Sequence, residues 1–195
     1  ADAGLGIPAL DQANEALNEL VEVPPTSAEA IDAVIELIDR GFGAEVVNRG
    51  NQPRYNTAKD QIIMPDISKY VAKAGVENSD KGKANYYFDL LHELVHSTGH
   101  ADRIDRLNRQ SKDGEDSYAF EELVAEMSAS MIAVELGLDK YVNLELSEGY
   151  IQGWIKRIEG TKDPKFIVQA ASKAEQAANW LKYGQKYAQE ESQDL

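Results

Sequence analysis

Residues 92–96 read His-Glu-Leu-Val-His, and this stretch decides the expected fold of the 195-residue chain. In a helix, positions four apart lie on one face, one turn from each other, so the imidazoles of His92 and His96 can converge on one metal ion. Glu93 is rotated by about 100° from His92, which places it beside the metal as a general base rather than as a ligand. The leucine and valine residues around the motif can pack the helix into a core. The spacing therefore predicts a buried helix that carries a metal site.

All three histidines of the chain fall within residues 92–100, which favours a shared role. Two alternatives stay open. One is a surface helix that carries these residues by chance. The other is a buried histidine pair without metal, which would need two hydrogen-bond partners for each ring.

A peptidase zinc site needs a third protein ligand and leaves its fourth position for water. The chain contains no cysteine, so the third ligand must be His100 or a carboxylate. His100 follows Gly99, whose lack of a Cβ suits a left-handed cap at the end of the helix. We therefore expect His100 to end the helix or to hydrogen bond to a ligand, rather than to bind the metal itself.

The carboxylate candidates lie on a predicted helix over residues 118–136, which contains Glu121, Glu122 and Glu126. Glu122 and Glu126 are four apart and share a face with small residues that would let the metal helix approach closely. Glu121 is expected to project from the adjacent strip. The alternative is an ordinary solvated acidic face.

The rest of the chain indicates an α+β fold that is mostly helical. Three short segments have strand character and predict a small antiparallel sheet of about three strands: 44–48, 54–56 and 61–64. Helices are expected over 9–21, 86–98, 118–136 and 147–158. Two further helices are expected to begin at the capping box Thr26-Ser27-Ala28-Glu29 and at Pro164. Residues 102–114 are expected to form a polar loop. These boundaries predict an N-terminal arm over 1–25, one domain over 26–185 and an acidic tail over 186–195.

The composition limits the partners and the compartment. A net charge of −14 repels a phosphate backbone, so nucleic-acid binding by this segment is not expected and a protein or peptide partner is. No stretch approaches 18 consecutive apolar residues, so no membrane-spanning segment is expected. Residue 1 is Ala, so we expect the chain to have been trimmed, and its lack of cysteine fits a reducing compartment such as the cytoplasm. The oligomeric state cannot be read from the sequence.

Four segments together resemble the C-terminal zincin-like metallopeptidase domain of ArdC-type antirestriction proteins, a domain that also occurs in polyvalent proteins of phages and plasmids. The matching segments occur in the same order, over roughly residues 28–182: Arg54-Tyr55 with Ile62-Ile63-Met64-Pro65, residues 92–100, residues 118–126, and Tyr150-Ile-Gln-Gly-Trp154. The resemblance implies a zincin-like fold with an HExxH active-site helix.

The resemblance also implies a gluzincin-like site, in which two histidines and a glutamate of the next helix bind Zn²⁺. Carried over to this chain, His92, His96 and Glu122 are the ligands. Glu126 then orients one of the metal-bound histidines. The family typically has an N-terminal domain that binds single-stranded DNA, for which this chain has no room.

Peptide-bond hydrolysis is the expected activity, with Glu93 accepting the proton of a zinc-activated water and passing it to the leaving amine. Three side chains could stabilise the oxyanion, and the sequence does not choose among Tyr118, Tyr55 and Arg103. The strand over 61–64 is expected to offer an edge to which an extended substrate adds. The alternative function is a non-catalytic, zinc-stabilised antirestriction domain that engages a host protein. The presence of Glu93 favours catalysis, because a purely structural site needs no base.

Overall fold

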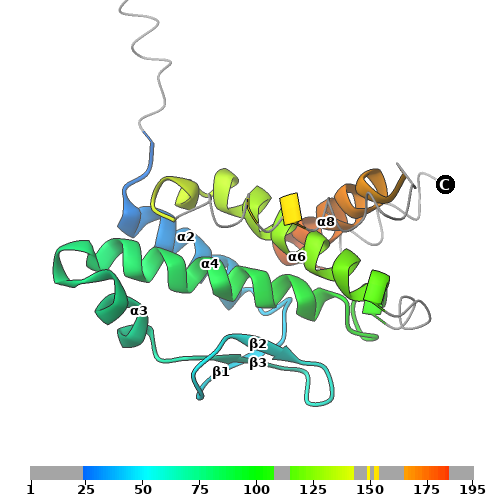
Figure 1. Ribbon diagram of the computed structural model, residues 1–195, viewed down its shortest axis with the longest axis horizontal. Coiled ribbons are helices and arrows are strands. Elements are labelled where there is room, and N and C mark those ends of the chain that lie inside the picture. Colours follow the sequence, from blue (N-terminus) through cyan, green and yellow to red (C-terminus); the bar gives the residue numbers. More distant parts are fainter. Residues whose placement is uncertain (1–23, 108–114, 143–148, 150–151, 154–164, 185–195) are drawn as a thin grey trace, which may run out of the picture.

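A computed structural model describes residues 24–107, 115–142, 149, 152–153 and 165–184. Its helices and strands, in chain order, are α2 (Ser27–Asp39), β1 (Glu45–Asn48), β2 (Arg54–Asn56), β3 (Gln61–Met64), α3 (Ile67–Ala74), α4 (Ser79–Thr98), α6 (Glu115–Glu135) and α8 (Lys165–Tyr183), with short 3-10 turns at Val76–Asn78 and Leu138–Lys140. Helix α4 runs through the centre, with α3 and the sheet on one side and α2, α6 and α8 on the other (Figure 1). The mostly helical α+β fold predicted from the sequence is confirmed.

The sheet differs from the predicted antiparallel one. Its strand order is β1-β3-β2, with β3 antiparallel to β2 but parallel to β1. The chain reverses direction between β1 and β2 and again between β2 and β3, so β1 and β3 run the same way. Strand β3 is the most apolar of the three, and its Ile62, Ile63 and Met64 are buried. Because this apolar strand takes the central position, where it is buried, it pairs with both β1 and β2, and the sheet is mixed.

This strand order also overturns the expectation that residues 61–64 offer an edge to substrate. Strand β3 has a partner on both sides. The edges of the sheet, among the residues that the structure describes, are β1 and β2.

The core forms where α4 meets the two flanking layers. On α4, Leu91, Leu94 and Val95 are buried, as the apolar residues around the motif predict. Helices α6 and α8 pack closely, because the small alanine side chains between them permit a short distance between the helix axes. The buried alanines of these two helices are Ala119, Ala125, Ala129, Ala133, Ala170, Ala174, Ala177 and Ala178.

Helix α2 begins as the capping box predicts. The hydroxyl of Thr26 accepts a hydrogen bond from the Glu29 amide at 3.3 Å, and the Glu29 carboxylate accepts one from the Thr26 amide at 2.8 Å. These bonds satisfy amides that the first helical turn leaves without partners.

The sequence did not predict α3, nor the first two turns of α4. The carboxylate of Asp66 caps α3 by accepting a hydrogen bond from the Ser68 amide at 2.8 Å. Its apolar residues, Ile67, Tyr70, Val71 and Ala74, follow helical spacing and are half-buried, but the segment is only eight residues long. The short helix is held mainly by its packing on α4.

Gly82 allows the close packing of α3 on α4. A Cβ at this position would lie 2.8 Å from the Tyr70 carbonyl oxygen and 2.8 Å from the Val71 Cα, both backbone atoms. We expect Gly82→Ala to lower the free energy of unfolding by about 1–3 kcal/mol, because α3 must shift to relieve the overlap. Chemical denaturation measures this change, with Lys83→Ala as an exposed neighbour that should stay within about 0.5 kcal/mol of wild type. A variant stabilised by the better helix propensity of alanine would contradict this packing.

The end of α4 differs from the predicted left-handed cap. Gly99 has φ −74° and ψ −3°, which is right-handed helical backbone. A Cβ there would lie 2.7 Å from the Leu107 side chain and 3.2 Å from Nη2 of Arg106. A glycine is therefore needed at this position because the segment that carries Arg106 and Leu107 packs closely against the end of α4.

Several predictions fall wholly or partly outside the described residues. These are the N-terminal arm with its helix over 9–21, the helix over 147–158, the cap at Asp163-Pro164 and the acidic tail. Among the helices that the structure does describe, none has the length and apolar character needed to cross a membrane.

Candidate metal centre

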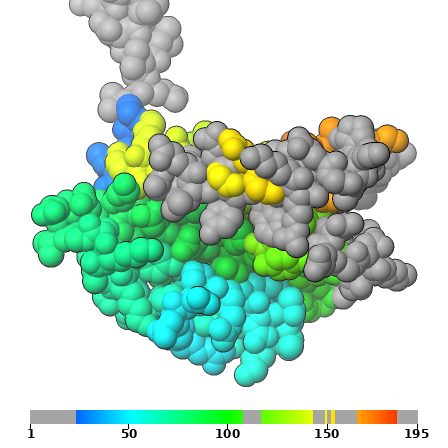
Figure 2. Space-filling model, viewed as in Figure 1, coloured from blue at the N-terminus to red at the C-terminus, as the bar shows by residue number. Residues whose placement is uncertain are grey.

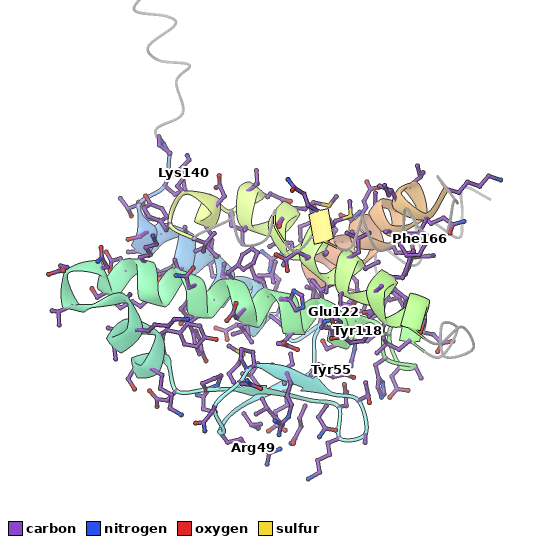
Figure 3. All side chains as sticks on the ribbon, in the orientation of Figure 1. Arg49, Tyr55, Tyr118, Glu122, Lys140 and Phe166 are labelled. Carbon is purple, nitrogen blue, oxygen red and sulfur yellow. The ribbon has the colours of Figure 1, made fainter. Side chains whose placement is uncertain are left out.

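The predicted ligands meet where α4 packs against α6. One nitrogen from each of His92 and His96 and one carboxylate oxygen of Glu122 all lie within 4.8 Å of one another. The Nε2 atoms of the two histidines are 3.1 Å apart, and they lie 3.6 and 3.5 Å from the Glu122 oxygens. Figure 3 shows Glu122 and Tyr118 on α6 facing the space between α4 and Tyr55 of the sheet.

These distances suit a divalent cation. Two nitrogens bound to one zinc ion at 2.0–2.1 Å in tetrahedral geometry are separated by about 3.3 Å. Each Nδ1 atom faces a carboxylate, Glu126 for His92 at 3.0 Å and Glu121 for His96 at 3.1 Å. If both Nδ1 atoms carry the proton, the two Nε2 lone pairs face each other, which is favourable only with a cation between them. The donor set therefore fits a metal ion.

Glu126 contacts His92, as the resemblance implied. Its carboxylate is nearly buried, with 7% of the residue exposed. Burial of the His92 ring disfavours the charged imidazolium, but hydrogen bonds to Glu122 and Glu126 outweigh burial and raise the pKa of His92 to about 10. The surroundings of His92 are thus arranged to stabilise positive charge, whether a proton or a metal ion supplies it.

Glu121 was expected to project from the strip of α6 next to Glu122, and from there it reaches the site. It is buried, and it accepts a hydrogen bond from the His96 ring. Burial opposes ionisation of Glu121, but hydrogen bonds from Arg106 and His96 hold the pKa of its carboxyl below the ordinary value. Each candidate histidine ligand therefore has its own carboxylate, and both carboxylates come from α6.

Arg106 is the functional residue that the sequence reasoning missed. Its Nε and Nη2 atoms bind the two oxygens of Glu121 at 2.7 and 2.6 Å. The same guanidinium donates to the Thr98 hydroxyl at 3.1 Å and to the Val95 carbonyl at 3.0 Å, so it also ties down the end of α4. Arg106 is only 4% exposed, whereas residues 102–114 were expected to be a polar loop.

Glu93 lies on the sheet side of the metal group. Burial raises the pKa of Glu93, and the neighbouring imidazoles and a backbone hydrogen bond with Tyr55 limit the rise. A carboxylate of raised pKa is a better proton acceptor near neutral pH, which a general base requires. Strand β2, which carries Tyr55, is thereby placed next to the expected base.

His100 lies apart from the metal group. Its Nδ1 accepts a hydrogen bond from the Asp102 amide at 3.2 Å, and its carbonyl accepts bonds from the amides of Arg103 and Asp105. These bonds organise the turn that follows α4. That place agrees with the expectation that His100 ends the helix.

The three candidate oxyanion donors occupy different surroundings. The Tyr55 hydroxyl donates to Asp60 at 2.7 Å, and Arg103 binds the same carboxylate as well as the Ser97 carbonyl. These two side chains therefore hold the β2–β3 turn against the end of α4. Tyr118 is 61% exposed and hydrogen bonds to Glu122. Of the three, Tyr118 is the one in contact with an expected ligand.

Comparison with known proteins agrees with this geometry. Residues 32–173 match the family model described as "Zincin-like metallopeptidase". Two crystal structures of the antirestriction protein ArdC from the R388 plasmid share the fold. The metal-free one has a TM-score of 0.60 and 31% identity and the Mn(II)-bound one a TM-score of 0.59 and 30% identity. Each match covers 84% of this chain, and 53% and 54% of the two ArdC chains.

Two curated relatives have similar identity. The uncharacterized protein y4eC of Sinorhizobium fredii (strain NBRC 101917 / NGR234) is 30% identical over 148 residues, which is 76% of this chain and 44% of that protein. The DNA primase TraC of Escherichia coli is 31% identical over 180 residues, which is 90% of this chain and 11% of that protein. The chain thus spans less than half the length of each of these relatives.

Proposed function

Because this chain belongs to the zincin-like metallopeptidase family, we propose that it is a metal-dependent peptidase that hydrolyses peptide bonds, with Zn²⁺ as its ion. The observation that carries the proposal is the convergence of His92, His96 and Glu122, whose ligand atoms lie within 4.8 Å of one another. Glu93 beside them supplies the base that hydrolysis requires.

The chain's own residues divide the work as follows. His92, His96 and Glu122 would hold the ion, while Glu126 and Glu121 orient the two imidazoles. When bound, the ion supplies Lewis acidity, which lowers the pKa of water and polarises a carbonyl group.

Glu93 takes the proton from the attacking water and returns it to the nitrogen of the leaving amine. Tyr118, whose side chain hydrogen bonds to Glu122, would donate to the oxyanion in place of that bond. An extended substrate would lie along β2, which is an edge strand and hydrogen bonds to Glu93 through the Tyr55 backbone.

The natural substrate is proposed to be one specific protein, met in the bacterial cytoplasm in a phage or plasmid context. Plasmid-encoded ArdC and the bacterial relatives support this setting. The name of ArdC as an antirestriction protein supports a second function, in which a metal-stabilised domain binds a host protein without cutting it. The partly buried Glu93 carboxylate beside the metal group favours the catalytic function, since binding alone needs no base.

Proteome-derived peptides provide a test that suits a peptidase whose substrate is unidentified. The protein is stripped with a chelator, reloaded with Zn²⁺ or Mn²⁺, and incubated with the peptides, and new termini are identified by mass spectrometry. We expect cleavage with metal and none without it. A metal-loaded protein that cuts neither these peptides nor any protein in a host lysate would support the binding function instead.

The ligand set has its own test. We expect Glu122→Ala to weaken metal binding by at least about 100-fold, because loss of a ligand costs at least as much as loss of an orienting partner. His100→Ala should bind metal like wild type, since its described hydrogen bonds organise a turn. Metal stoichiometry after dialysis distinguishes the two. Loss of metal from the His100 variant alone would reverse the assignment.

A further inference from the structure

A pocket lies between α3 and α4, next to the metal centre. It has a volume of about 400 Å³, within the range of ligand-binding pockets. Helix α3 lines it with Tyr70 and Lys73, and α4 lines it with Lys81, Asn85 and Asp89. Figure 2 shows the face of the molecule on which these two helices (green) lie beside the sheet (cyan).

The pocket and the expected base lie along one i, i+4 ridge of α4, which winds by about 40° per step, so Asn85 is turned by about 80° and Lys81 by about 120° from Glu93. Lys81, Asn85, Asp89 and Glu93 follow each other at intervals of four residues, so each lies about one turn from the next. Asp89 stands three residues before His92 on α4, so the near end of the pocket lies about one helical turn from the metal group. At 1.5 Å per residue, Asn85 lies about 12 Å and Lys81 about 18 Å from Glu93 along the helix.

The pocket offers positive charge on a strongly acidic protein. Neither Lys73 nor Lys81 makes a salt bridge or hydrogen bond with any residue that the structure describes. The one acidic side chain of the lining, Asp89, accepts a hydrogen bond from the Tyr70 hydroxyl at 2.6 Å, and its charge also interacts with that of Lys73 without a salt bridge. Two ammonium groups and the Asn85 amide therefore remain for a ligand.

Close packing of α3 on α4 holds the walls of the pocket, and the exposed side chains of Lys73 and Lys81 lie at its rim. The backbone of α3 packs on Gly82, where even a Cβ would overlap it, and the rings of Tyr70 and Tyr86 pack edge to face with centroids 5.4 Å apart. A preformed site loses less conformational entropy on binding than a flexible one.

We propose that this pocket binds a carboxylate of the peptide substrate and so selects where the proposed peptidase cuts. The proposal rests on the proposed function, because the pocket begins one helical turn before Glu93 on the same helix. An extended peptide advances about 3.3 Å per residue, so the carboxylate lies about four or five residues from the cleaved bond. It can be an Asp or Glu side chain or the carboxyl terminus of the substrate. A nucleic-acid phosphate suits the pocket less well, since the chain carries a net charge of −14 and Asp89 lines the pocket.

Cleavage profiling tests the selection. Wild type should prefer peptides with Asp or Glu about four or five positions from the cut. Wild type should cleave these peptides faster than their Asn and Gln counterparts. In the double variant Lys73→Ala/Lys81→Ala, the ratio of the two cleavage rates should fall by about three- to tenfold. Lys83→Ala, which removes an equal charge from an exposed site outside the pocket, should keep the preference. Free and amidated carboxyl termini distinguish a terminal carboxylate from a side chain.

A charge reversal separates selection from a general loss of folding. Lys73→Glu should shift the preference toward Lys and Arg at the same position of the peptide, which a merely unstable protein would not do. An unchanged profile in both the double-alanine and the charge-reversed variants would overturn the proposal.

A second measurement does not depend on turnover. In the Glu93→Gln protein, acetylation rates of individual lysines are compared with and without a pool of glutamate-containing peptides. Lys73 and Lys81 should be protected at least about threefold, Lys83 should not, and the glutamine counterparts should protect none of them. Protection by a single-stranded oligonucleotide but not by the peptides would overturn the proposal in favour of nucleic acid.

The two measurements keep the two hypotheses distinguishable. Protection without cleavage by wild type means that the peptidase assignment fails and the carboxylate site stands. Cleavage without an acidic preference and without protection means that the pocket assignment fails and the peptidase stands.

Discussion

Glu93→Gln is expected to lower peptidase activity by about 10²–10⁴-fold, because the amide cannot accept a proton from the attacking water. The same variant should bind metal with wild-type stoichiometry, since Glu93 is not one of the three residues whose ligand atoms converge. Glutamine has the size of glutamate and can still accept the backbone hydrogen bond from Tyr55. The measurements are cleavage of the identified peptides and metal content.

A matched control is Glu36→Gln on α2, an exposed position on the opposite side of α4. It makes the same chemical change and should leave activity unaltered. Full activity in the Glu93 variant would rule out Glu93 as the base. Loss of metal from that variant would instead make Glu93 part of the metal site.

Arg106→Met is expected to lower the free energy of unfolding by about 3–5 kcal/mol, because it leaves the charge of Glu121 buried without its partner. Glu121 is 6% exposed and both of its oxygens are bound by Arg106. For a chain of this size the loss corresponds to about 6–20 °C in melting temperature. Metal affinity should also fall by about 10–100-fold, because the carboxylate that orients His96 is no longer held.

A second substitution identifies the cause. Adding Glu121→Gln to Arg106→Met removes the buried charge and keeps an oxygen that can accept from the His96 ring, so it should restore much of the stability. Arg49→Met, which removes an exposed arginine with one bond to Gln61 at 3.3 Å, should change stability by less than about 0.5 kcal/mol. A double variant no more stable than Arg106→Met would show that the salt bridge is not the origin of the loss.

The sequence predicted the elements whose pattern is local. The capping box of α2 and the apolar neighbours of His92 are determined by residues a few positions apart, and both predictions are confirmed. The strand segments were also located. Their pairing was predicted wrongly, because the order β1-β3-β2 depends on which strand gains most from burial in the middle of the sheet. Helix α3 was missed because its stability comes from packing on α4.

The site residues also divide into those that local sequence spacing predicts and those that depend on tertiary packing. Spacing placed His92 and His96 on one face, and the family resemblance selected Glu122 among the three glutamates of α6; the structure brings these three residues together. Arg106 could not be found in this way, because its role depends on how the chain after α4 folds back over that helix. Glu121 was among the candidates, but its contact with His96 was not predicted. One signal did exist. Helices α4 and α6 are antiparallel, so if Glu126 meets His92, then a carboxylate about one turn earlier should meet His96.

The continuous helix α4 has a consequence for how such proteins can diverge. Lys81, Asn85, Asp89 and Glu93 stand on one unbroken helix from Ser79 to Thr98. Inserting a single residue between Asp89 and His92 would turn the pocket by about 100° relative to the base and move it by about 1.5 Å. Insertions and deletions within this segment are therefore excluded wherever both the pocket and the base are used. Cleavage preference would have to change by substitution alone, and the length of this stretch should be the same in homologues that cut different targets.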